Sequence, residues 1–195
     1  HTRCSWVSWA GDVYKRQIHG SWSSNAGHNS PLYQSPPGDP DGSVETGINY
    51  LANSRGIPNS KLNMGIPFWG KKYNTSQING SFSGSVVDMH YSEILPLIDN
   101  GWDYQWDNNA KCPYLIKNDQ SQIITYDNPL SIQRKSEFAK DRNLGGVMVW
   151  ALGYDAQNSS ETLTEAIYTH WLSTEEGHVI VPVSYTHLRA HETHE

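Results

Sequence analysis

The sequence predicts an α/β fold, part of a (β/α)8 TIM barrel that carries a small α+β insertion. Two observations lead to this prediction. Helical and strand patterns alternate along the chain, and one strand is apolar on both faces, as in a parallel sheet covered by helices. Both predicted strands also end in loops rich in polar and aromatic residues, where barrel proteins place their sites. The 195 residues suffice for one domain or for part of a larger one.

The first barrel part is expected over residues 18–72. It starts with a long polar loop, 23–43, rich in Gly, Pro and Ser. Ser43 is a predicted N-cap of an amphipathic helix over 44–55, because Val44, Ile48 and Leu51 share one face. A short apolar strand over 62–68 follows, so this part has the helix and strand of a βαβ unit.

The middle of the chain, residues 73–126, is predicted to be the α+β insertion. It opens with a segment rich in Ser, Gly and Asn whose apolar positions alternate, as in antiparallel strands. One or two helical turns are expected over 92–98, and a hairpin is expected over 115–126.

The last barrel part is expected over 127–181. A turn leads into a helix over 131–142, and a nearly continuous apolar run over 147–152 predicts a strand buried on both faces. A third helix, 160–173, follows that strand.

Both ends of the chain look foreign to this fold. Residues 1–17 and 182–195 show no sustained periodicity, and the stretches DVYKRQ and VSYTHLRAHET resemble translated sequencing-adaptor DNA. His187, His191 and His194 have the spacing of a metal-binding helix face, but we interpret them as part of an accidental tail. Both ends are therefore left out of the fold prediction.

The composition argues against two kinds of partner and favours a third. The net charge is −6 and Lys and Arg form no cluster, which argues against a nucleic-acid partner. No run of 18 apolar residues exists, so no membrane span is predicted. The chain has 8 Trp and 11 Tyr but only 3 Phe, which suits ligands such as sugars that offer an apolar face beside hydroxyls.

Three tryptophans fall at or just beyond strand ends. Trp150 ends the last strand, Trp69 follows the earlier strand, and Trp22 lies just after the start of the first barrel part. Strand ends of a parallel barrel meet at one mouth, so these side chains are expected to form a stacking site for pyranose rings. Asp155 follows in the loop after the last strand.

Five segments in order along the chain resemble the chitinases of glycoside hydrolase family 18. They are HGSW with GHNSPLY (19–22 and 27–33), KLNMGIPFWG (61–70), WDNNAKCPYL (106–115), TYDNPLSIQRK (125–135) and GGVMVWALGYD (145–155). The resemblance implies the last three βα units of the barrel, with the insertion between strands seven and eight. It also implies chitin or N-acetylglucosamine oligomers as ligands.

The resemblance assigns roles to six residues. Trp150 is similar to the tryptophan that forms the floor under the sugar next to the scissile bond, with Met148 packed beneath it. Trp22 is similar to a platform on the leaving-group side. Trp69 and Lys71 stand where the family more often has Tyr and Arg, so the resemblance does not determine which hydrogen bonds these two residues make. The sixth residue, Glu93, resembles a wall residue; for Lys71 and Glu93 an ordinary solvated surface charge is an equal alternative.

The catalytic residues of the family are absent from this chain. The catalytic acid ends a DxxDxDxE run, which the sequence lacks, and the family's Met-x-Tyr-Asp stretch should directly precede His19. Asp12 and Tyr14 lie in the adaptor-like stretch and are assigned no role. Because the substrate's acetamido group attacks while that Glu protonates the leaving oxygen, the chain alone is expected to be an inactive carboxyl-terminal fragment.

The leading interpretation is thus a chitinase that hydrolyses β-1,4-linked N-acetylglucosamine polymers with retention, and endo action is expected. Alternatives are a chitin-binding lectin without the acid, a family member acting on peptidoglycan or glycoprotein glycans, and a small α/β domain without a site. As family-level expectations, the whole protein is secreted and monomeric and needs no cofactor or metal.

Overall fold

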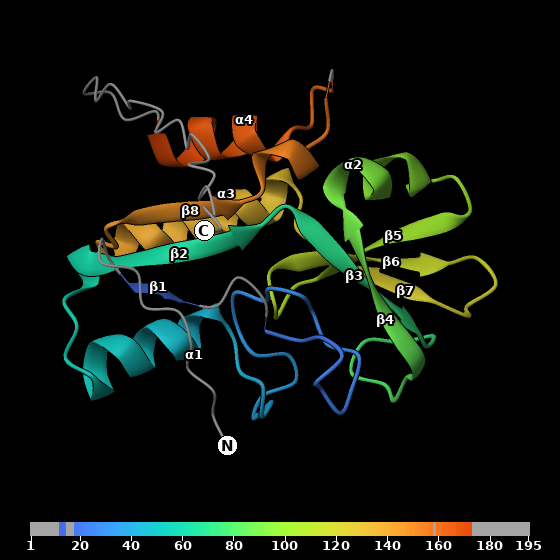
Figure 1. Cartoon of the computed structure of the whole chain (residues 1–195), viewed down its shortest axis with the longest axis horizontal. Helices are drawn as coiled ribbons and strands as arrows, with labels where there is room; N and C mark the ends of the chain where they lie inside the picture. The colour runs from blue at the N-terminus through green and yellow to red at the C-terminus, as the bar shows by residue number, and fades with distance from the viewer. Residues whose placement is uncertain (1–11, 15–17, 158, 173–195) are drawn as a thin grey trace, which may run out of the picture.

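The computed structural model describes residues 12–14, 18–157 and 159–172 (Figure 1). The remaining parts of the two foreign-looking ends, including His187, His191 and His194, lie outside these residues. Among the described helices, none is long and apolar enough to cross a membrane.

The chain forms two sheets with short helices around them (Figure 1). The strands are β1 (Asp12–Tyr14), β2 (Leu62–Pro67), β3 (Trp69–Asn74), β4 (Ser83–His90), β5 (Trp102–Asp107), β6 (Cys112–Lys117), β7 (Ile123–Thr125) and β8 (Gly146–Trp150). The α-helices are α1 (Val44–Asn49), α2 (Tyr91–Ile94), α3 (Pro129–Asp141) and α4 (Leu163–Ile167).

The first sheet is parallel and has the order β1-β2-β8. Its register places Gly65 opposite Met148 and Pro67 opposite Trp150. The two predicted barrel strands are therefore parallel neighbours, as expected. Helices α1 and α3 cover this sheet through a shared core that contains Leu32, Val44, Ile48, Leu62, Met64 and Phe138.

The parallel sheet starts earlier than the sequence predicted. We expected the barrel part to begin at residue 18, but β1 pairs with β2 from Asp12 onward. Strand pairing uses backbone groups, which every residue except proline supplies, so a segment without apolar periodicity can still occupy a sheet edge.

The second sheet is antiparallel, with the order β4-β3-β7-β6-β5. The hairpin expected over 115–126 is confirmed, since β6 and β7 pair antiparallel. This sheet begins at Trp69 rather than at the predicted residue 73. The reason is that the chain passes from β2 into β3 across one residue, Phe68, whose N–H donates to the carbonyl of Trp150 at 2.8 Å.

Helix bounds differ from the predicted ones at both ends. Helix α3 begins at Pro129 rather than at 131, after the N-cap Asn128, and α4 begins at Leu163 rather than at 160, after the N-cap Thr162. The predicted helix over 44–55 is α1 followed by a π-helical turn, Tyr50–Ser54, and α4 continues in the same way through Tyr168–Leu172. The predicted start at Ser43 is correct, because its hydroxyl accepts from the N–H of Thr46 at 3.2 Å. Side chains at the N-cap determine a helix start, whereas the last turn adapts to packing.

Candidate functional site

The carboxyl ends of β2 and β8 lie together and present Trp150. The parallel register brings Pro67 beside Trp150, and the Trp150 side chain stays about half exposed, at 52%. Met148 precedes it by two residues and is half-buried, so both side chains lie on one face of β8. β8 thus ends in an exposed indole, with half-buried Met148 two residues before it.

Trp69 is placed differently from the sequence expectation. Only 7% of it is exposed, and its ring meets that of Tyr154 edge to face, with centroids 6.4 Å apart. Its indole face therefore cannot serve as an open stacking platform. Within the described residues, its buried Nε1–H has no hydrogen-bond partner, so it offers a donor rather than a face.

Lys71 is not a solvated surface charge. Only 5% of its surface is exposed. Its ammonium forms an ion pair with Asp88, the residue opposite it on β4. The same ammonium lies 5.5 Å from the ring centroid of Trp22. A cation over an indole face at this distance is attracted to it, so Lys71 supports the Trp22 ring.

Trp22 has the exposure that a platform requires. Its side chain is 59% exposed, while its Nε1 donates to the carbonyl of Ile18 at 3.2 Å. The ring lies over Gly20, where an added Cβ would come within 2.6 Å of the indole. The ring therefore packs against the backbone at Gly20 and lies near Lys71, while more than half of the side chain remains exposed.

Glu93 lies beside the aromatic residues and has a structural role. Its Oε2 accepts from the backbone N–H of His90 at 2.7 Å and so caps α2. His90 stacks on Tyr154 with centroids 3.7 Å apart, and Tyr154 in turn meets Trp69. With 57% of its side chain exposed, Glu93 keeps acceptor capacity for a hydroxyl.

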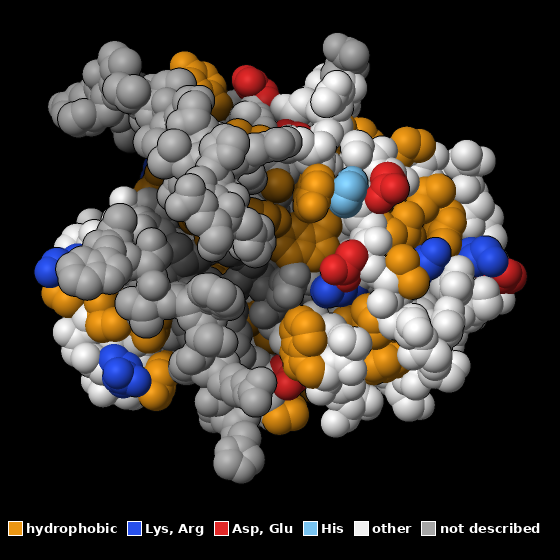
Figure 2. Space-filling model, viewed as in Figure 1, with side chains coloured by type: hydrophobic (Ala, Val, Ile, Leu, Met, Phe, Trp, Pro, Cys, Tyr) orange, Lys and Arg blue, Asp and Glu red, His pale blue; other side chains and the backbone are white. Residues whose placement is uncertain are grey.

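Ring contacts link Trp69, Tyr154 and His90, and Trp22 lies beside Lys71. Trp150 is joined to this region through the backbone bond from Phe68, the residue before Trp69. We group eight residues as one candidate site and name it the aromatic cleft: Trp22, Trp69, Lys71, His90, Glu93, Met148, Trp150 and Tyr154. Figure 2 shows hydrophobic side chains across the middle of this face, with a histidine and charged side chains beside them. Sequence reasoning missed His90, Tyr154 and Asp88. Tyr154 could have been noticed in the loop after β8, but the other two depend on the β3–β4 register, which no sequence pattern revealed.

The loop that carries Trp22 is tied to β5. His28 Nε2 lies 2.9 Å from Asp107 Oδ2, and the Ser35 hydroxyl donates to the same oxygen at 2.8 Å. Burial acts to raise the pKa of Asp107, but bonds from His28, the Ala110 N–H and Ser35 outweigh it and hold that pKa well below its ordinary value. Asn29 adds a bond from its side-chain amide to the Trp69 carbonyl at 2.7 Å.

Replacing Asp107 with Asn is expected to destabilise the fold at neutral pH by roughly 1–3 kcal/mol, because hydrogen bonds to a charged group are lost. The folded-state pKa is lowered, so this stability is present above the unfolded pKa of about 4 and is lost as pH falls below it. Urea unfolding of both proteins at pH 6 and pH 3 checks this. If the two proteins differ in free energy of unfolding by the same amount at pH 6 and at pH 3, the charge of Asp107 has no such role.

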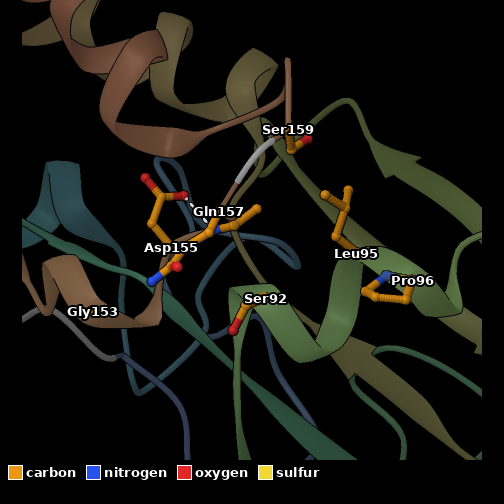
Figure 3. A pocket seen from close by; sticks show the side chains of 8 residues that line it. Ser92, Leu95, Pro96, Gly153, Asp155, Gln157 and Ser159 are labelled. Atoms are coloured by element: carbon orange, nitrogen blue, oxygen red, sulfur yellow. Dashed lines mark hydrogen bonds between the residues drawn. The ribbon is translucent and has the colours of Figure 1, made fainter.

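A separate pocket of about 370 Å³ lies between α2 and the segment after β8 (Figure 3). Ser92, Gln157 and Ser159 give it polar groups. Its only carboxylate among the described lining residues is Asp155, which accepts from the N–H groups of Leu163 and Thr164 at 2.9 Å. Asp155 thus holds the start of α4, and the pocket has no free acid or base.

Three aspartates within the family-like segments form structural contacts. Asp107 binds His28 and Ser35, Asp155 caps α4, and Asp127 forms a buried ion pair with Lys135 at 2.6 Å. Glu93, a carboxylate of the aromatic cleft, is also engaged, because it accepts from the backbone N–H of His90. The exposed indoles of Trp22 and Trp150 offer stacking surfaces, and Glu93 offers a hydrogen-bond acceptor.

The chain is similar to several known proteins. Residues 12–155 match the family described as "Glycosyl hydrolases family 18". "Probable chitinase 2" of Drosophila melanogaster is 32% identical over 157 residues, covering 70% of this chain and 32% of that protein. The chain thus spans about a third of this relative.

Two solved structures are also similar. The Ostrinia furnacalis Group IV chitinase superposes with a TM-score of 0.74 at 26% identity, covering 84% of this chain and 51% of that one. Human YKL-39, described as a pseudo-chitinase with retained chitooligosaccharide binding, superposes with a TM-score of 0.71 at 28% identity, covering 80% of this chain and 48% of that one.

Proposed function

Because the chain belongs to the glycosyl hydrolases of family 18, we propose that it is the carboxyl-terminal part of a chitinase and supplies one wall and the floor of its cleft. The substrate is a β-1,4-linked N-acetylglucosamine polymer. The observation that carries this proposal is the exposed indole of Trp150 at the carboxyl end of β8, with Met148 two residues before it on the same strand.

Each part of the cleft has a chemical role in the proposed reaction. The C–H face of a pyranose stacks on Trp150, and distortion of that sugar brings its acetamido oxygen towards the anomeric carbon. The acid that protonates the leaving oxygen is a Glu supplied from outside this chain. Trp22 stacks a sugar on the leaving-group side, while Glu93 accepts from a hydroxyl of that sugar.

The test separates binding from cleavage. The 195-residue chain is titrated with chitotetraose and, as a control without acetamido groups, with cellotetraose, and tryptophan fluorescence is followed. We expect saturable binding of chitotetraose alone, and no cleavage products. Equal responses to both sugars, or no response to either, would contradict the proposal.

Replacing Trp22 with alanine is expected to lower activity on long oligomers selectively. The reason is that Trp22 contacts only sugars beyond the one that stacks on Trp150. In the whole enzyme, kcat/KM for chitohexaose should fall by roughly tenfold, the equivalent of one aromatic contact. Activity on chitobiose derivatives should stay within twofold. A similar loss on both substrates would place Trp22 elsewhere.

A chitin-binding lectin is the second candidate, and the similarity to human YKL-39 favours it. Both functions use the same aromatic cleft, so the residue that closes the DxxDxDxE run of the whole protein distinguishes them. Glu there predicts hydrolysis, and any other residue predicts binding alone. Under the first proposal, the whole protein is secreted, monomeric and endo-acting.

A further inference from the structure

His19, Asp39 and Asp41 form a cluster apart from the residues of the aromatic cleft. His19 is buried, with 3% exposed, and its Nε2 lies 2.9 Å from Asp39 Oδ2 and 3.8 Å from Asp41 Oδ2. The three candidate ligand atoms all lie within 4.8 Å of one another. His19 begins the loop that carries Trp22, and the two aspartates belong to a turn 20 or more positions later.

The orientation of the His19 ring is determined by its other nitrogen. Nδ1 lies 2.7 Å from the carbonyl oxygen of His28, and a carbonyl only accepts, so Nδ1 carries a proton. Nε2 therefore faces the two carboxylates, and whenever it carries no proton it points an unshared electron pair at them. The ring also packs against Gly27, where an added Cβ would come within 2.2 Å of it, so it cannot turn away.

An electron pair that faces carboxylates in a buried place is unfavourable unless a positive charge lies between them. A proton on Nε2 would leave one positive charge against two negative ones. In the described part of the chain, His19 is the only cationic partner in an ion pair with either aspartate. A divalent cation would neutralise both carboxylates while leaving the imidazole neutral, and an Nδ1–H bound to a carbonyl is the usual outer support of a ligating histidine.

The two distances from His19 suit a small transition-metal ion. For an ion about 2.1 Å from each ligand, atoms 2.9 and 3.8 Å apart subtend roughly 90° and 130°. One imidazole with two carboxylates is a ligand set for zinc, whereas Ca²⁺ and Mg²⁺ prefer oxygen ligands alone.

We propose that His19, Asp39 and Asp41 bind a divalent cation of the zinc class, which closes the loop between them. The ion has no part in catalysis. It joins the two ends of the loop and thereby holds the segment on which Trp22 stands. This proposal is independent of the function assigned to the aromatic cleft.

The test uses the full 195-residue chain with His187, His191 and His194 replaced by alanine, because those imidazoles could bind zinc themselves. Zn²⁺ is titrated calorimetrically at pH 7.5 into this protein and into three further variants of it: Asp39→Asn with Asp41→Asn, Asp41→Asn alone, and Asp103→Asn. Asp103 is an exposed aspartate on β5 and serves as the matched control. Circular dichroism of each variant monitors folding.

One Zn²⁺ per chain is expected, with affinity roughly 100-fold or more lower in the double variant and unchanged in Asp103→Asn. Asp41→Asn keeps the contact between His19 and Asp39, so it tests the site even if the double variant fails to fold, and it should weaken binding at least tenfold. Zn²⁺ should also raise the Tm of the parent chain and of Asp103→Asn equally, that of Asp41→Asn less, and that of the double variant least. Equal affinity in Asp41→Asn and Asp103→Asn, or no saturable binding, would overturn the proposal in favour of a protonated His19.

Discussion

Replacing Trp150 with alanine in the whole chitinase is expected to lower kcat/KM by roughly 100-fold or more, or about 2.7 kcal/mol of transition-state stabilisation. The reason is that the exposed indole offers a face which the distorted sugar meets best, so its loss affects the transition state more than the bound substrate. The measurement is activity on a chitooligosaccharide, normalised to the folded fraction.

The alternative is that Trp150 only packs the end of β8. In that case alanine would lower the Tm and leave each folded molecule active. Tyr50→Ala provides a matched control, because Tyr50 is also an exposed aromatic residue, at 47%, but belongs to the turn after α1. Full activity per folded molecule in Trp150→Ala would end its assignment as the sugar floor.

Replacing Lys135 with methionine is expected to destabilise the chain by roughly 3–5 kcal/mol, because it leaves a buried carboxylate without its partner. Lys135 is fully buried, and its Nζ lies 2.6 and 2.8 Å from the two oxygens of Asp127 and 3.0 Å from the Ser30 hydroxyl. The cation thus joins α3, the turn after β7 and the loop that carries Trp22. Urea unfolding of the 195-residue chain measures the effect.

Two further variants identify the cause. Arg134→Met, one position away on α3, removes an exposed ion pair with Glu137 and should cost less than about 1 kcal/mol. Adding Asp127→Asn to Lys135→Met removes the unpaired charge and should restore part of the lost stability. Similar losses in Lys135→Met and Arg134→Met would show that burial of this pair does not matter.

Several features of the molecule follow from the sequence alone. The apolar run over 147–152 predicted a strand, and β8 pairs in parallel with β2. The predicted burial on both faces is wrong, because β8 is an edge strand of the described sheet and its residues are half-buried or exposed. Ser43 predicted the start of α1, which its hydroxyl caps. The position of Trp150 after an apolar strand predicted an aromatic residue at a strand end, and its side chain is exposed there. The confirmed predictions succeed because periodicity and capping involve residues close together in the chain.

Other features were decided only by tertiary structure. Lys71 is buried because the antiparallel register places Asp88 opposite it, and Trp69 is covered because Tyr154 reaches it from the loop after β8. Neither the register of β3 against β4 nor the course of that loop leaves a pattern in the local sequence. His19 meets Asp39 for the same reason, through a turn 20 positions away. Local sequence determines which residues form a strand or begin a helix, whereas burial and charge pairing depend on the packing of segments that are distant along the chain.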